Sequence, residues 1–396
     1  MKKTLLTVLM LQCLISISQN IKENKFEWQA PGGQYINPSS FFSLHGYVNA
    51  VFGSASENWT NGNFNGIGMP GQLLVPNTNH SAFTTDEALW ISSELSNKTS
   101  LVMELHLVSS PSGNGAAGPG GLTIVMTEAN ASWDIIDKYL KASFGTFWSP
   151  FCKVNTEWLG AQNLFSLIPQ ASGAYITHYN EKGIRFSGYH QKSEKTGFNY
   201  AFTIGNGFNA FDVSGYNSWD FNENKTINGR VGIFPGAGKN IEVGFSAGKG
   251  DVSNGNSDLP ISNPTSAKSN FVAVGSDLTI SHKRFTYKGY IIYSEKSYHT
   301  NNATDVVYGN GIFSEIDYKI NLKKSFIESF SPKFRIDYLK TISNFTAIPS
   351  YKFNGYSFGV NFAVNSRFTI SLDQNVLLEN SPIDNNRFIA KVSAEF

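Results

Sequence analysis

Apolar and polar residues alternate along most of the chain with a period of two. Between residues 285 and 293, Phe285, Tyr287 and Ile291 fall on one face, whereas Thr286 and Lys288 fall on the other. Successive side chains of a strand point to opposite faces, so the pattern predicts strands with one apolar and one polar face. About sixteen segments show it, with expected bounds 42–53, 87–96, 100–108, 122–132, 139–147, 181–190, 196–206, 225–234, 240–248, 269–280, 284–294, 309–322, 328–340, 352–364, 367–377 and 386–396.

The connections between these segments alternate in length. Long ones span 54–86, 109–121, 148–180, 207–224, 249–268, 295–308, 341–351 and 378–385, and short ones such as 97–99, 191–195, 235–239 and 365–366 fall between them. Short periplasmic turns and long external loops are typical of outer-membrane barrels. In lipid the backbone must be hydrogen-bonded within the protein, so the sheet must close. We therefore predict an all-β fold, a transmembrane antiparallel up-and-down β-barrel of about 16 strands, wide enough for a water-filled channel.

The N-terminus resembles an export signal. Lys2 and Lys3 precede the apolar stretch 5–17, and Ser16 and Ser18 are the small residues expected before a cut at Gln19. The expected organisation is a signal peptide at 1–18, a short periplasmic segment at 19–41 and a transmembrane barrel at 42–396. This predicts export to the bacterial cell outer membrane.

Composition and charge narrow the choice further. Charged residues make up 15% of the chain, against roughly 25% in ordinary soluble domains. The net charge of +1 gives no sign of a nucleic-acid partner. Without the leader, Cys152 is the one remaining cysteine, so no disulfide forms within the mature chain.

The connection 148–180 is unusually apolar for its length. It contains Trp148, Phe151, Trp158 and Phe165. Loops of more than 30 residues are usually functional or disordered, and the apolar content argues against disorder. We expect this loop to fold inward against the barrel wall.

The same region resembles a known family. The stretch from Lys141 to Phe151, with Asn155, Pro169 and the strand Gly183–Gly188, is similar to the fifth strand and third loop of Gram-negative outer-membrane porins, broadly the phosphate-selective group. The resemblance implies that loop 148–180 enters the lumen and sets a constriction, with candidate residues Trp148, Phe151, Lys153, Glu157, Trp158 and Phe165. It also implies that Phe396 is the signal for the barrel-assembly machinery, and that the protein forms a homotrimer. Thr146 and Cys152 depart from the family pattern, and Lys153 is the one basic residue between Trp148 and Ile176, so phosphate selectivity is not implied.

Charged residues at the polar positions of the strands should face the lumen. The candidate pore-lining residues are Glu94, Glu104, Arg185, Arg230, Arg284, Lys288, Glu315, Asp317, Arg335, Asp337, Arg367 and Asp373. Two interpretations stay open: opposed acidic and basic walls that create a transverse field, or neighbouring pairs across the sheet that neutralise each other. The loop 251–258 has oxygen ligands but lacks the closing glutamate of a calcium loop, so a solvated loop is the better interpretation.

The predicted function is an outer-membrane porin, a water-filled channel for passive diffusion of small hydrophilic solutes or ions, with no catalytic residue, metal or cofactor. Its other partner is outer-membrane lipid. One alternative is a barrel enzyme of the lipase or protease type, which would have fewer strands and a narrower lumen. A surface adhesion or scaffold barrel is the other.

Overall fold

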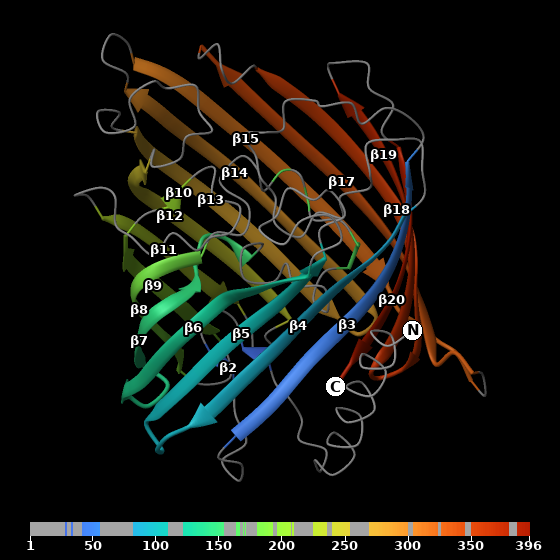
Figure 1. Cartoon of the computed structure of the whole chain (residues 1–396), viewed down its shortest axis with the longest axis horizontal. Coiled ribbons are helices and arrows are strands. Elements are labelled where there is room, and N and C mark those ends of the chain that lie inside the picture. The colour runs from blue at the N-terminus through green and yellow to red at the C-terminus, as the bar shows by residue number, and fades with distance from the viewer. Residues whose placement is uncertain are drawn as a thin grey trace.

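Strand pairing runs around the molecule without a free edge. The computed structural model describes residues 28–29, 33–34, 42–55, 82–109, 122–153, 164–166, 169, 171, 180–192, 196–206, 208–209, 225–235, 240–253, 269–299, 304–323, 326–344, 350–379 and 386–396. Its sixteen long strands are β3 (Phe42–Ala55), β4 (Ala82–Glu94), β5 (Thr99–Ser109), β6 (Leu122–Ile136), β7 (Leu140–Trp148), β8 (Asn180–Lys192), β9 (Thr196–Gly205), β11 (Thr226–Phe234), β12 (Ile241–Ser253), β13 (Ser269–His282), β14 (Phe285–His299), β15 (Thr304–Tyr318), β17 (Ser329–Ser343), β18 (Tyr351–Asn365), β19 (Phe368–Glu379) and β20 (Arg387–Glu395). Each pairs antiparallel with the next, and β20 pairs with β3 to close the barrel (Figure 1).

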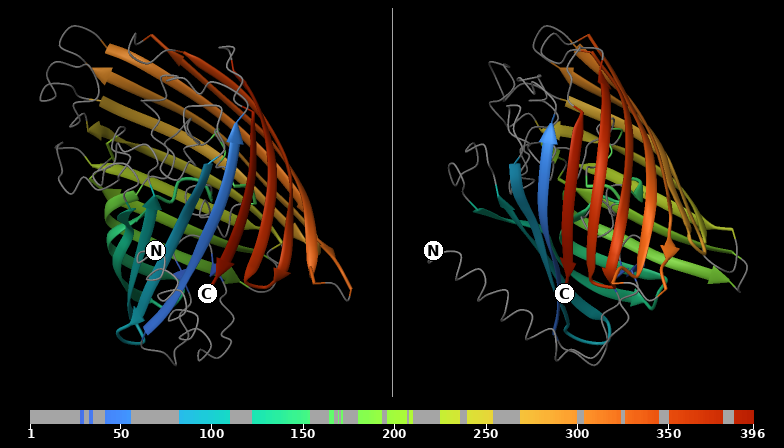
Figure 2. Two further views of the ribbon diagram at one scale, coloured as in Figure 1. Left: turned by 45° about the vertical axis from the view of Figure 1, so that its right-hand side comes forward. Right: turned by 90° about the vertical axis from the view of Figure 1, so that its right-hand side faces the viewer.

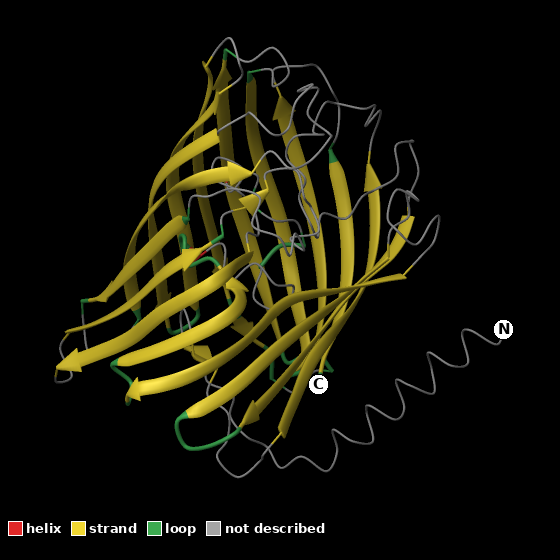
Figure 3. Ribbon diagram, turned by 60° about the vertical axis from the view of Figure 1, so that its left-hand side comes forward, coloured by secondary structure: helices red, strands yellow, loops and turns green. Residues whose placement is uncertain are grey.

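Four two-residue strands complete the assignment. β1 (Trp28–Gln29) pairs with β2 (Gly33–Gln34), and β10 (Phe208–Asn209) pairs in parallel with β12. β16 (Ile320–Asn321) follows β15 in the chain and continues its antiparallel pairing with β17. Within the described part of the chain, no helix is long and apolar enough to cross a bilayer. Figure 3 shows strands and short loops there.

The seam between the first and last long strands continues to the end of the chain. Backbone hydrogen bonds of 3.0 Å join the N–H of Phe396 to the carbonyl of Gly46 and the N–H of Gly46 to the carbonyl of Phe396. A Cβ atom at Gly46 would lie 2.6 Å from Cζ of Phe396, so the absence of a side chain there makes room for the terminal ring. Figure 2 shows the C-terminus beside β3.

The barrel wall is uneven in height. β7 and β11 have 9 residues each, whereas β14, β15, β17 and β18 have 15 each. In Figure 1 the orange and red strands accordingly form a tall wall opposite the shorter green strands. The closed barrel and each of the sixteen predicted strand segments are confirmed.

Several strands run further than the apolar alternation predicts. β12 reaches Ser253 and β14 reaches His299, and β15 already begins at Thr304. Asp251, expected in a loop, is therefore in a strand and pairs with Asn270. At these ends the backbone ladder continues beyond the segments in which apolar and polar residues alternate.

The two faces of the sheet have opposite chemistry. Outward-pointing Phe245, Ile291 and Phe358 are exposed by 54%, 59% and 53%, whereas inward-pointing Arg230 and Arg335 are 2% exposed. Apolar groups outside and charged groups inside are the arrangement that a lipid-embedded barrel requires. The chain is a transmembrane β-barrel of the outer-membrane type.

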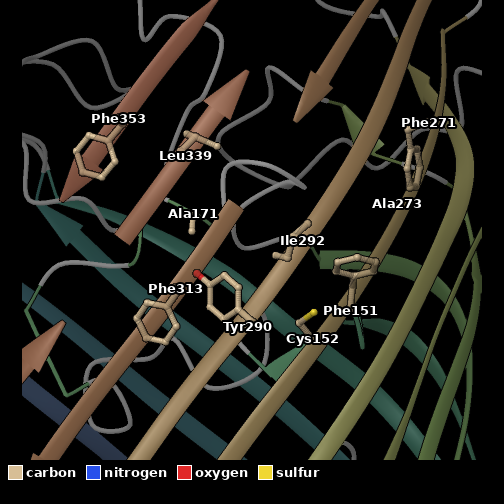
Figure 4. Packing of buried hydrophobic residues seen from close by; sticks show 10 residues of the cluster. All are labelled: Phe151, Cys152, Ala171, Phe271, Ala273, Tyr290, Ile292, Phe313, Leu339 and Phe353. Carbon is tan, nitrogen blue, oxygen red and sulfur yellow. The ribbon is translucent and has the colours of Figure 1, made fainter. Parts of the chain in front are cut away.

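One patch of the inner face is apolar, although the polar positions of the strands were expected to line the lumen. The patch consists of Phe271, Ala273, Tyr290, Ile292, Phe313, Leu339 and Phe353, on β13 to β18, together with Phe151, Cys152 and Ala171 from the connection between β7 and β8. Figure 4 shows Phe151 and Cys152 beside Tyr290 and Ile292. The wall is apolar here because it packs against this connection.

Candidate channel lumen

Arg230 is the centre of a buried charge network on the inner face of β9 to β13. Its Nη2 and Nε donate to the two carboxylate oxygens of Asp277 at 2.5 and 2.9 Å. Its Nη1 donates to Glu242 Oε1 at 2.9 Å and to Asn199 Oδ1 at 3.3 Å. A bidentate arginine–carboxylate pair fixes the geometry of both side chains.

The Arg230–Asp277 pair spans an intervening strand. Arg230 is on β11 and Asp277 on β13, and Gly244 of β12 lies between them. A Cβ atom at Gly244 would be 2.5 Å from both carboxylate oxygens of Asp277 and closer still to Nη2 of Arg230. The pair therefore lies directly on the backbone of β12.

A second pair repeats this arrangement on the other side of the barrel. Lys333 of β17 and Asp373 of β19 are 2.7 Å apart and both fully buried. Gly359 of β18 is the direct ladder partner of both. A Cβ atom at Gly359 would lie 2.6 Å from Cε of Lys333 and closer still to Asp373 Oδ1.

Other inward charges also form pairs, either with the adjacent strand or across one intervening strand. Arg335 and Glu315 stand opposite each other in the ladder between β15 and β17, and Nη2 donates to Oε2 at 2.9 Å. Arg185 of β8 lies 3.7 Å from Glu128 of β6. Of the two interpretations of the lumen charges, the described ion pairs favour neutralised neighbours.

A smaller polar and aromatic group lies on β3 to β7. Glu104 Oε2 accepts a 2.8 Å hydrogen bond from Nε1 of Trp148, and its Oε1 lies 2.6 Å from Nε2 of His106. Trp148 also packs against Trp90 and Tyr47. Because Trp148 ends β7, these contacts fix the point at which the connection to β8 leaves the wall.

The first described residues of that connection contact β12. The N–H of Cys152 donates to Ser246 Oγ at 2.9 Å, and Lys153 Nζ lies 2.5 Å from Glu242 Oε2. Cys152 adopts a left-handed backbone with φ of 50°. Its thiol is buried, and burial raises the pKa of the thiol above its usual range.

A second group of described residues in the connection, 164–166 and 171, contacts β17 and β19. Lys333 Nζ donates to the carbonyl of Leu164, and the N–H of Ser166 donates to Asp373 Oδ2 at 2.7 Å. The ring of Phe165 lies 4.5 Å from Lys333 Nζ and 4.5 Å from the Arg335 guanidinium carbon, within cation–π range. We call Lys333, Arg335 and Asp373 the clasp.

The clasp is far from the origin of the connection. Around the ring from β7, the successive neighbours are β8, β9, β11, β12, β13, β14, β15 and β17, so β17 lies halfway round. Further along, the N–H of Ala171 donates to Asp337 Oδ1 at 2.7 Å, also on β17. The described residues of the connection therefore contact the inner wall on β12, β17 and β19.

Most of the residues predicted to line the pore lie on the inner face of the barrel. Eight of the predicted pore-lining residues are buried and point inward: Glu104, Arg185, Arg230, Glu315, Asp317, Arg335, Asp337 and Asp373. Lys288 and Glu94 are half-buried, on β14 and at the end of β4. Trp148, Phe151 and Phe165 are buried and Lys153 is half-buried, whereas Glu157 and Trp158 lie outside the described residues.

Two of the predicted wall positions are wrong. Arg284 and Arg367 are exposed residues of the tight turns between β13 and β14 and between β18 and β19. Lys283 takes the left-handed backbone (φ 55°) of its turn, which starts β14 one residue later than the alternation indicates. Lys333 falls on the polar face of its strand in the sequence but was not among the predicted pore-lining residues, and Gly359 was missed; the importance of both depends on the register of three strands.

Solved structures of bacterial outer-membrane proteins share this architecture. OmpT of Vibrio cholerae superposes with a TM-score of 0.56 at 9% identity, over 91% of this chain and 100% of that one. OmpF of Salmonella typhi, in complex with daunomycin, gives 0.56 at 12% identity over 90% and 97%, and the outer-membrane channel DcaP of Acinetobacter baumannii gives 0.54 at 11% over 90% and 97%. No protein-family model and no curated protein matches the chain by sequence. The chain has the closed sixteen-stranded barrel fold of bacterial outer-membrane porins.

Proposed function

We propose that the protein is an outer-membrane channel for passive diffusion of small hydrophilic solutes, and that the connection between β7 and β8 sets its narrowest part. The porin-like barrel with inward-facing charged groups supports a channel. The observation that carries the constriction is the binding of residues 164–166 by the clasp, halfway round the barrel from β7. Described residues of one connection are thus bound on separate parts of the inner wall, which supports a constriction at this level of the barrel.

The clasp holds this segment mainly through its backbone. Lys333 donates a hydrogen bond to the carbonyl of Leu164, and Asp373 accepts one from the N–H of Ser166. Phe165, which is 0% exposed, fills the space beside both cations. Removing the ammonium group of Lys333 would leave the segment without its carbonyl donor and Asp373 without its counter-charge.

Conductance across planar bilayers tests both parts of the proposal. We expect the purified wild-type protein to insert with discrete current steps, and Lys333→Met to change the step size or add frequent partial closures. Lys340→Met is the matched control, because Lys340 is an exposed residue of the same strand. Folded protein that never conducts refutes the channel, whereas identical records for the wild type and Lys333→Met refute the constriction.

Export, assembly and oligomeric state belong to the same proposal. We infer that the chain is exported with cleavage after residue 18, performs no covalent chemistry and is assembled through Phe396 into outer-membrane lipid. A homotrimer is supported by OmpT of Vibrio cholerae, which is described in a trimer form. N-terminal sequencing of the mature protein and native mass spectrometry test the cleavage and the trimer.

A further inference from the structure

We propose that the passage carries little net field and admits uncharged hydrophilic solutes in preference to ions of either sign. This inference rests on the proposed channel. It names the solute class that the inner wall favours, which follows from how the wall arranges its charges.

Three cations of the inner wall, Arg230, Arg335 and Lys333, form close pairs with carboxylates. Arg230 is bound by Asp277 and Glu242, and Arg335 is bound by Glu315, with nitrogen–oxygen distances of 2.5 to 2.9 Å. Lys333 and Asp373 are 2.7 Å apart. At the distance of a passing solute, opposite charges this close act as a small dipole, whose field falls off faster than that of a single charge.

Two glycines keep two of the pairs close to the wall. Gly244 and Gly359 face inward between the partners, and a Cβ atom at either position would collide with the paired side chains. The Arg230–Asp277 and Lys333–Asp373 pairs therefore lie flat on the middle strand. Flat pairs offer a solute neither a projecting cation nor a projecting carboxylate.

Several other carboxylates are occupied by neutral donors. Glu181 Oε2 accepts hydrogen bonds of 2.9 Å from Thr203 Oγ1 and from Asn228 Nδ2. Asp337 accepts from the N–H of Ala171, and Glu104 from Nε1 of Trp148. These bonds satisfy the carboxylate oxygens and hold the groups against the wall instead of letting them project toward a solute.

The charged groups of these pairs are also almost fully shielded from solvent. Arg230 and Arg335 are 2% exposed and Asp373 is 1% exposed. An ion that sheds part of its hydration shell in the passage finds in these pairs no unpaired fixed charge of opposite sign to offset the lost hydration free energy. An uncharged solute loses much less hydration free energy when it enters. The wall therefore favours neutral hydrophilic molecules.

Reversal potentials and liposome swelling test this inference. In a potassium chloride gradient we expect a potassium-to-chloride permeability ratio within about threefold of one. In swelling assays, glucose should enter faster than gluconate of similar size. A ratio beyond about tenfold in either direction, or faster entry of gluconate, overturns the inference, whereas the absence of any conductance refutes the channel instead.

A matched pair of variants tests the role of pairing. Glu315→Gln leaves the Arg335 guanidinium charged, because arginine does not deprotonate in proteins, so the permeability ratio should move toward chloride by about twofold or more. Glu328→Gln removes the same charge from an exposed position and should leave the ratio unchanged. An unchanged ratio in a folded, conducting Glu315→Gln protein overturns the inference.

Discussion

Adding one methyl group at Gly244 should destabilise the barrel substantially. The new Cβ would lie 2.5 Å from both carboxylate oxygens of Asp277 and closer to Nη2 of Arg230, so the pair must separate. Neither partner has room to yield, because the side chains of Arg230 and Asp277 are 1% and 3% exposed and Arg230 is also held by Glu242. Breaking a buried ion pair costs about 3–5 kcal/mol.

One effect acts in the opposite direction. Replacing glycine by alanine in a strand reduces the entropy lost on folding, by roughly 0.5–1 kcal/mol. The net loss expected for Gly244→Ala is therefore about 2–4 kcal/mol. Gly229→Ala is the control, since its Cβ would meet its nearest atoms at 3.6 and 3.7 Å, an ordinary contact. That control should be neutral or slightly stabilising.

The measurement is urea unfolding in lipid vesicles, followed by tryptophan fluorescence, with the slope of the transition compared between variants. A third variant separates this mechanism from a general intolerance of alanine. With Asp277→Ala already present, Gly244→Ala should cost far less, because the carboxylate that it would displace is absent and no Arg230–Asp277 pair remains to be broken. Equal stability of Gly244→Ala and Gly229→Ala, or simple additivity in the double variant, refutes the reasoning.

Three further predictions concern the connection and the seam. Phe165→Ala removes a fully buried ring and should speed tryptic cleavage after Lys153, the one basic residue between residues 148 and 176, whereas Phe326→Ala, at an 82% exposed position, should not. Since burial raises the pKa of the Cys152 thiol, maleimide labelling at pH 7.5 should be slow in the folded protein and fast in urea, and fast labelling of the folded form would contradict the burial. Gly46→Val should destabilise the barrel by about 1–3 kcal/mol through overpacking, because its Cβ would lie 2.6 Å from Cζ of Phe396 and 2.7 Å from the carbonyl oxygen of Ala88, and unchanged urea unfolding would count against these contacts.

The sequence predicted the strands well because lipid imposes a period of two on each of them. Ile291 and Tyr293 face outward as expected, and so do Ile316 and Phe358. Strand ends were predicted less well, since Lys283 and Arg284 form a turn whose polarity resembles that of an inward strand position. Alternation reports which face a residue occupies and says little about where the ladder stops.

The chemistry of the interior was less predictable, because it depends on pairing between distant residues. Lys333, Gly359 and Asp373 are aligned by the register of β17, β18 and β19, and a shift of one residue in either ladder would separate them. The apolar patch was missed for a related reason. Tyr290, Ile291, Ile292 and Tyr293 are apolar on both faces, and the pattern alone does not say that the inner pair packs against Phe151.

The apolar patch and the clasp together bear on whether the connection can move. Phe151 and Phe165 are both 0% exposed, and burying a phenylalanine contributes about 1.5–3 kcal/mol. Lifting both rings into water would thus cost roughly 3–6 kcal/mol before any clasp hydrogen bond is broken. Since every 1.4 kcal/mol is a factor of ten, the lifted state would be populated at about 1% or less. Lipid on the outer face offers no hydrophobic gain for packing one element of the protein on another, so the hydrophobic packing between segments of this barrel lies on the inner face, where it holds the connection in place.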